Sequence, residues 1–290
     1  MMFLEAPDRR SPRHETCPTP FAAPANGELA RFRRAQRLAF ECATRVEAEA
    51  REGMTERDLA ARLGALLAEA GVRHLFHAPM AWVGERTELG DGWSETDFMP
   101  TDRRHEAGLP VILDVAPIVD GFVADVAYTF AVGPCPELDA TLDDLAVLRA
   151  LVPRAIRAGL TLADTYALVG DLLAERGYAA RHARYPLGIL GHRVARLAPG
   201  AGDGSFPGAF GPAALAFLRA DGGPSPLWNG SAACVRRPEP GVWAVEPHLG
   251  RGGVGAKLEE ILVVTDDDAW WLDDDLPHVR RAEARARAAL

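Results

Sequence analysis

The sequence is poor in the features that mark secreted, membrane and nucleic-acid-binding proteins. It has only four cysteines in 290 residues, widely spaced and without a Cys-x-x-Cys pattern, which favours a reduced, cytoplasmic protein. No apolar run approaches the ~20 residues of a membrane span, and the start of the chain lacks the apolar core of a signal peptide. The net charge of −9 argues against a nucleic-acid partner, because phosphate binding needs a basic surface.

What remains has the composition of an ordinary globular protein, with 48% hydrophobic and 25% charged residues. Residues 1–26 are rich in Pro and Arg without apolar periodicity, which predicts a flexible arm. Residues 27–275 are expected to form a single domain, interrupted by a Gly-, Pro- and Ala-rich insertion at about 197–232. Residues 276–290 are expected to form an Ala/Arg-rich helical tail in solvent.

The most informative segment is the β-rich stretch 110–133, which contains Asp114 and Asp125. Asp120-Gly121 in its middle is a strong hairpin signal. With these two residues as the turn, Asp114 lies opposite Ala127, and Asp125 is its diagonal neighbour, with Cα atoms roughly 7–8 Å apart. Two carboxylates this close in apolar surroundings need compensating charge, which a pair of divalent cations would supply. The alternative is one buried structural Asp and one exposed Asp.

The chain also repeats itself. A helix is expected from near Asn26, and a second follows the capping box that begins at Thr55; further helices are expected at about 137–157 and 161–176. The segment 53–71 matches 159–177 with ten identities in nineteen positions, at a constant offset of 106 residues. Capped amphipathic helices resemble one another, but this number of identities favours a duplicated domain.

A duplicated domain predicts a second acidic hairpin after the second pair of helices. Residues 241–265 provide it, with Glu246 on one strand and Glu259 on the other. A pseudo-twofold axis would then point four carboxylates into one cleft, and their four negative charges match two divalent ions. Glu260 competes with Glu259 for this place, because both faces of that strand are apolar.

These motifs resemble the pita-bread metallopeptidases, the superfamily of methionine aminopeptidase, Xaa-Pro aminopeptidase and prolidase. The family's five metal ligands are matched in order by an Asp pair eleven residues apart, a His after Gly191, a Glu in Val-Glu-Pro and a Glu before the final strand. The resemblance covers roughly residues 28–275 and implies an α+β pita-bread fold. It identifies the ligands as Asp114, Asp125, His192, Glu246 and Glu259, which leaves Glu260 to orient a ligand.

The substrate-binding residues of the family are less well matched. Its Gly-His-Gly-x-Gly motif reads Gly-His-Arg-Val-Ala here, so that Arg193 and Ala195 replace glycines. Pro199 stands where the family usually has a second His, and Asp97 stands near the place of a substrate-facing His. His248, two residues after Glu246, is expected to substitute in part as a catalytic residue. His77 and His105 are weaker candidates for such a role, and the interpretation of both as surface or loop histidines is favoured.

The resemblance implies a dinuclear hydrolase that cleaves a short peptide or amino-acid amide near its N-terminus, with Glu246 holding the transferred proton. Ligands rich in carboxylates with one imidazole suit Mn²⁺, and also Fe²⁺, Co²⁺ or Zn²⁺. The altered residues motivate two alternatives: a binding protein that has lost turnover, or a metalloenzyme that acts on a different small molecule. The full ligand set argues against the metal-free route of creatinase. The sequence identifies neither the substrate nor whether the chain forms a homodimer.

Overall fold

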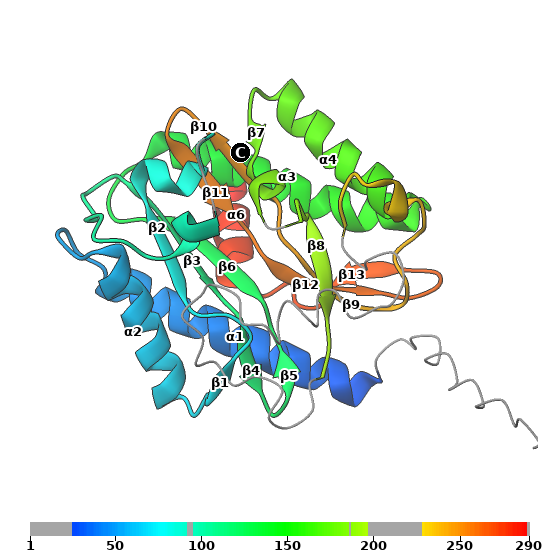
Figure 1. The fold of residues 1–290 in the computed structure, drawn as a ribbon, viewed down its shortest axis with the longest axis horizontal. Coiled ribbons are helices and arrows are strands. Elements are labelled where there is room, and N and C mark those ends of the chain that lie inside the picture. Colours follow the sequence, from blue (N-terminus) through cyan, green and yellow to red (C-terminus); the bar gives the residue numbers. More distant parts are fainter. Residues whose placement is uncertain (1–24, 92–94, 186, 197–227, 289–290) are drawn as a thin grey trace, which may run out of the picture.

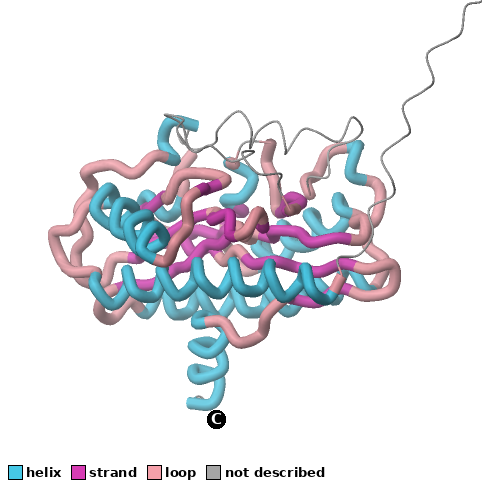
Figure 2. The backbone as a smooth tube through the Cα atoms, turned by 90° about the horizontal axis from the view of Figure 1, so that it is seen from below, coloured by secondary structure: helices cyan, strands magenta, loops and turns pink. Residues whose placement is uncertain are grey.

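A computed structural model describes residues 25–91, 95–185, 187–196 and 228–288. The expected arm up to residue 24, most of the expected insertion (197–227) and Pro199 therefore lie outside the described residues. Antiparallel strands form a layer at the centre of the molecule, and long helices run along one side of it (Figures 1 and 2). The α+β class expected from the sequence is confirmed. None of the described helices has both the length and the apolar character that crossing a membrane would require.

The first half of the fold begins with two helices, α1 (Asn26–Glu49) and α2 (Glu56–Glu69). Apolar residues of α1 at helical spacing, such as Phe32, Ala39 and Val46, are buried. Thr55 caps α2 as its sequence predicts, since its side chain accepts a hydrogen bond from the amide of Asp58. The strands of this half are β1 (His74–Leu75), β2 (Met80–Val83), β3 (Pro110–Val115), β4 (Pro117–Val119), β5 (Phe122–Val123) and β6 (Val126–Ala131).

The hairpin β3–β6 has the register predicted from its turn. Asp120 and Gly121 both have positive φ (52° and 87°), as a tight two-residue turn requires. Val119 pairs with Phe122, and Asp114 pairs with Ala127, so one register runs through the whole hairpin. Strand β2 adds to β3, and β1 adds to β4.

The second half repeats this plan. Helix α3 leads to α4, which is the same length as α2 and begins 106 residues after it; Thr161 caps α4 as Thr55 caps α2. Strand β7 adds to β10 as β1 adds to β4, and β8 adds to β9 as β2 adds to β3. The elements are α3 (Pro136–Arg157), α4 (Leu162–Glu175), β7 (Ala179–Ala180), β8 (Gly191–Val194), β9 (Gly241–Val245), β10 (His248–Arg251), β11 (Val254–Lys257), β12 (Glu260–Val264) and β13 (Ala269–Trp271).

Short 3₁₀ helices complete the chain between these elements: η1 (Gly84–Glu88), η2 (Glu95–Phe98), η3 (Arg181–Arg184) and η4 (Ala232–Cys234). The last helix, α6 (Pro277–Ala288), projects from the layer of helices (Figure 2). It is nevertheless tied to the body, because Arg281 pairs with Glu47 of α1 and His278 with Glu260 of β12. The residues expected to be a solvated tail thus make side-chain contacts with both halves of the fold.

Candidate metal centre

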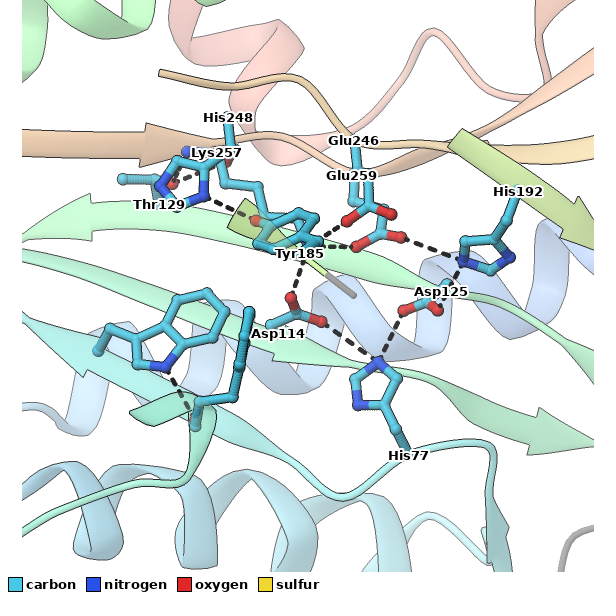
Figure 3. A network of polar contacts seen from close by, with 12 residues as sticks. His77, Asp114, Asp125, Thr129, Tyr185, His192, Glu246, His248, Lys257 and Glu259 are labelled. Carbon is cyan, nitrogen blue, oxygen red and sulfur yellow. Dashed lines mark hydrogen bonds and ion pairs between the residues drawn. The ribbon is translucent and has the colours of Figure 1, made fainter. Parts of the chain in front are cut away.

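The two halves meet where their hairpins lie side by side. Ala127 of the first hairpin and Glu259 of the second form an antiparallel bridge, with the Ala127 amide donating to the Glu259 carbonyl at 3.4 Å. Around this bridge the structure brings together all five residues expected from the sequence (Figure 3). Each is at most 5% exposed, so the alternative of one exposed Asp in the first hairpin is wrong. The five are Asp114, Asp125, His192, Glu246 and Glu259.

Three of these residues form a compact group that we call the imidazole end of the centre: Asp125, His192 and Glu259. The Nε2 atom of His192 lies 3.2 Å from Asp125 Oδ2 and 3.8 Å from Glu259 Oε1. Its Nδ1 lies 3.0 Å from the carbonyl oxygen of Arg193, which can only accept, so Nδ1 carries a hydrogen and donates it. Nε2 is then the nitrogen available to a metal ion.

A second histidine enters the centre between the two aspartates. His77, in the loop before β2, places Nε2 2.9 Å from Asp125 Oδ1 and 3.3 Å from Asp114 Oδ1 (Figure 3). Burial alone would lower its pKa, but the charges of Asp125 and Asp114 outweigh that cost and raise the pKa well above the ordinary value. His77 does lie in a loop, but it is only 4% exposed and contacts the centre, so its interpretation as a surface histidine is wrong. His105, also buried, is not among the residues that contact the centre in the described structure.

Asp114, Glu246 and a second oxygen of Glu259 surround a lysine. The ammonium group of Lys257, at the end of β11, lies 2.6 Å from Asp114 Oδ2, 2.9 Å from Glu246 Oε2 and 2.8 Å from Glu259 Oε2. We call this the ammonium end of the centre. These carboxylates raise the pKa of Lys257 well above its ordinary value, against the effect of burial. The sequence held a signal for Lys257, because residues two apart on a strand face the same way, and it precedes Glu259 by two.

The carboxylates of the centre differ in pKa because their charged neighbours differ. Burial raises the pKa of Glu246 and raises that of Glu259 further, and the neighbouring carboxylates add to the effect. Burial acts on Asp114 in the same direction, but Lys257 and His77 outweigh it and keep its pKa below the ordinary value. His77 and His192 do the same for Asp125. The first hairpin thus supplies the more strongly anionic pair.

Comparison with known proteins places the chain in a family. Residues 30–266 match Metallopeptidase family M24, which is most of the chain. The chain belongs to metallopeptidase family M24. An uncharacterized peptidase from Staphylococcus aureus (strain MSSA476) is 24% identical over 152 residues, which make up 52% of this chain and 42% of that protein. The chain thus spans less than half the length of this curated relative.

Solved structures similar to this M24 chain share its fold at low sequence identity. An X-Pro aminopeptidase from Thermotoga maritima superposes with a TM-score of 0.66 at 17% identity, over 88% of this chain and 63% of that one. An Xaa-Pro dipeptidase from Bacillus anthracis gives 0.61 at 20% identity, over 86% of this chain and 61% of that one. The expected pita-bread architecture is confirmed by these likenesses.

The M24 family implies divalent metal ions, and the two ends of the centre differ in how well they fit one. At the imidazole end, a His nitrogen and two carboxylates offer atoms that all lie within 4.8 Å of one another. Such a mixed nitrogen and oxygen set suits a first-row divalent ion. At the ammonium end, Lys257 Nζ already contacts Asp114, Glu246 and Glu259. A second such group, His77, Asp114 and Asp125, shares Asp125 with the first group and Asp114 with Lys257. An ion bound by Asp114, Glu246 and Glu259 together would have to displace the lysine.

His248 lies beside the centre but faces away from its carboxylates. Its Nε2 lies 2.7 Å from the Thr87 carbonyl oxygen and its Nδ1 lies 2.7 Å from the Tyr185 hydroxyl. Burial, followed by the charge of Lys257, lowers the pKa of His248 well below its usual value, so the ring is neutral. Nε2 then donates to the carbonyl and Nδ1 accepts from Tyr185. The ring of Tyr185 in turn lies 4.7 Å from Lys257 Nζ, so His248 fixes a wall of the ammonium end.

Glu260 faces the helices instead of the centre. Its carboxylate accepts hydrogen bonds from Arg149 of α3 at 2.7 and 2.9 Å, and lies 2.6 Å from His278 Nε2 of α6. Successive strand residues point to opposite faces, so Glu259 and Glu260 cannot both enter the centre. Of the two, the structure directs Glu259 inward. The expectation that Glu260 orients a metal ligand is wrong, because its partners belong to the helix layer.

The residues that differ from the family motif have roles of their own. The guanidinium of Arg193 donates to the Pro240 carbonyl at 2.6 Å and packs over the ring of Trp243. The backbone carbonyl of Arg193 accepts a hydrogen bond from His192. Asp97 offers its backbone carbonyl to Arg86 at 2.7 Å. The next residue, Phe98, packs against Tyr185 with ring centroids 5.6 Å apart. Arg193 thus holds the ring of His192 through its backbone carbonyl, and the segment of Asp97 carries Phe98 against Tyr185.

Proposed function

We propose that this M24 chain is a divalent-metal-dependent hydrolase that cleaves a short peptide or amino-acid amide near its N-terminus. The observation that supports it is the convergence of four carboxylates from both hairpins with His192 of β8 in one buried centre. A structural salt-bridge network would not need an imidazole whose Nε2 faces two carboxylates while its Nδ1 is engaged by a backbone carbonyl. The names of the similar solved proteins, an X-Pro aminopeptidase and an Xaa-Pro dipeptidase, support the same class of substrate.

Under this proposal the imidazole end holds the ion, with Mn²⁺ as the first choice and Fe²⁺, Co²⁺ or Zn²⁺ as the others. A divalent ion bound there supplies Lewis acidity, which acidifies water and polarises a carbonyl. The residues around it position and charge the site. Asp125 contacts His77 through Oδ1 and His192 through Oδ2, and so orients the Nε2 atom of each imidazole toward its own carboxylate.

Proton transfer is assigned to Glu246. Its carboxylate shares the ammonium end with Asp114 and Glu259, directly after the end of β9, and so faces the space between the two hairpins. A carboxylate there accepts a proton from the attacking water and returns it to the leaving amine. We assign His248 a positioning role through Tyr185, in place of the catalytic role expected from the sequence, because both of its nitrogens are engaged.

One observation favours a second candidate, a family member with altered chemistry. Lys257 and His77 place basic groups inside the carboxylate cluster, where they compensate charge that metal ions would otherwise compensate. A centre of this kind also suits a metal-binding protein without turnover, or a metalloenzyme for another small molecule. The cytoplasmic location and the homodimer stay predictions.

Elemental analysis of the purified chain, followed by a cleavage screen, tests the proposal. The screen uses short peptides and amino-acid amides after Mn²⁺ has been restored. We expect bound metal, and cleavage that a chelator abolishes and added Mn²⁺ recovers. Bound metal without cleavage of any substrate would favour the second candidate. Cleavage that is indifferent to chelation would overturn metal dependence.

A further inference from the structure

The ammonium group of Lys257 is surrounded on several sides by oxygen atoms of the centre (Figure 3). It contacts one carboxylate of the first hairpin and two of the second, all within 2.6–2.9 Å, and its side chain is only 2% exposed. A buried lysine is rare unless its charge is paired. Here it is paired three times over, so the position is built for a cation.

The place of Lys257 follows from the duplicated backbone. The second hairpin has the register of the first, displaced by 132 residues. Asp114 pairs with Ala127 in the first hairpin. In the second, His248 pairs with Lys257 and Val245 pairs with Glu260, in the same register. By the same displacement Lys257 corresponds to Asp125. The second half thus directs a positive group toward the centre from the position where the first half directs a carboxylate.

The ammonium and a metal ion compete for the same oxygen atoms. An ion at the ammonium end would need Asp114, Glu246 and Glu259 at about 2.0–2.2 Å, and Nζ already lies against those oxygens. The two cations would overlap, and their charges would repel strongly in a buried site. Charge balance points the same way, because two divalent ions alone would match four carboxylates and leave the ammonium in excess.

We propose that Lys257 replaces one of the two metal ions, so that the centre combines one divalent ion at the imidazole end with a fixed ammonium at the ammonium end. The inference rests on the proposed function only in taking these same residues as the metal site. The ammonium would hold Asp114 and Glu246 in place and attract a developing negative charge on substrate. It would do so as a point charge with three donors, without the open coordination positions of an ion.

Metal counting on the full chain tests the proposal. Protein loaded with excess Mn²⁺ and then desalted is analysed for metal per chain and by electron paramagnetic resonance. We expect one Mn²⁺ per chain and the hyperfine sextet of an isolated ion. Lys257→Met keeps the length of the side chain and removes its charge, so we expect a second Mn²⁺ and a spin-coupled spectrum. Lys257→Arg, which keeps the charge, should stay at one.

Two Mn²⁺ per wild-type chain, or none, would overturn the proposal, and the wild-type count decides this even where Lys257→Met does not fold. A folded Lys257→Met that still binds one Mn²⁺ would overturn it as well. The cleavage screen gives a separate answer about function. One Mn²⁺ per chain without cleavage would support the replacement of an ion by Lys257 and contradict the proposed hydrolase. Two Mn²⁺ per chain with cleavage would overturn the replacement and support the hydrolase.

Discussion

The two hairpins have the same backbone but carry different chemistry. Both turn through two residues of positive φ, Asp120 and Gly121 in the first and Gly252 and Gly253 in the second. A displacement of 132 residues aligns them without a gap, and it sets Asp114 over Glu246 as equivalent carboxylates. It also sets Asp125 over Lys257, and Ala127 over Glu259. The two halves therefore carry a carboxylate at the first of these equivalent positions and side chains of different charge at the other two.

This difference shows how a duplicated fold comes to hold an asymmetric centre. In the first half, Asp125 reaches the imidazoles, and Ala127 leaves room at the bridge between the hairpins. In the second half the carboxylate has moved to Glu259, and Lys257 fills the position of the missing acid. The symmetry of the backbone fixes where side chains enter, whereas the side chains decide the charge at each end of the centre.

Removing Asp125, whose equivalent in the second half is Lys257, should have the largest effect on metal binding and turnover. We expect Asp125→Ala to weaken metal binding by on the order of 100-fold or more and to abolish turnover, because it removes a carboxylate shared by His77 and His192. Metal titration by calorimetry measures the loss. Asp102→Ala, at an exposed carboxylate paired with Arg57, is the matched control and should bind metal as the wild type does. Wild-type affinity in Asp125→Ala would contradict the assignment of the centre.

The opposite faces of the hairpins offer a second contrast, between Tyr128 and its equivalent Glu260. Both face the helices, but only Glu260 forms a buried ion pair, with Arg149. We expect Glu260→Gln to lower the free energy of unfolding by about 3 kcal/mol, because the guanidinium then loses its buried partner. Chemical denaturation measures this. Asp143→Asn, which removes the exposed partner of Arg285, should cost less than about 1 kcal/mol.

The same ion pair predicts a dependence of stability on pH. His278 and Arg149 outweigh the effect of burial and lower the pKa of Glu260 below its ordinary value of 4.5. The stability that this carboxylate contributes is therefore fully present above pH 4.5 and is lost as the pH falls through the folded-state pKa. Unfolding free energies of the wild type and Glu260→Gln should converge below pH 4.5. A difference that stays constant into acid would show that the charge of Glu260 is not responsible.

The smallest effect should come from the most symmetric feature, the helix caps. Thr55 and Thr161 each accept from the amide of an Asp three residues on, at 3.1 Å in both halves. We expect Thr55→Ala and Thr161→Ala each to cost about 1 kcal/mol of unfolding free energy. Thermal or chemical denaturation compares the pair. A much larger loss at one cap would show that the two helix pairs, so alike in sequence, support the fold unequally.

Much of the fold could be predicted from the sequence because its signals are local. The turn at Asp120-Gly121 fixed the register of the first hairpin, and the capping residues fixed the starts of α2 and α4. The five residues that the family resemblance identifies as metal ligands could be named in order, and the structure brings them together, although their binding of metal stays a prediction. The roles of His77 and Glu260 could not be predicted, since their partners lie 48 and 111 residues away in the chain.

The sequence by itself thus determined two capped helix pairs, two hairpins and the strand positions of the acidic residues, because each depends on neighbours a few residues apart. Only the tertiary structure decided which face of β12 turns inward, which histidine joins the aspartates, and that Lys257 lies among three carboxylates. The reason is physical. Charge compensation in a buried site depends on distances between strands of both halves, and these distances exist only once the two hairpins have packed together.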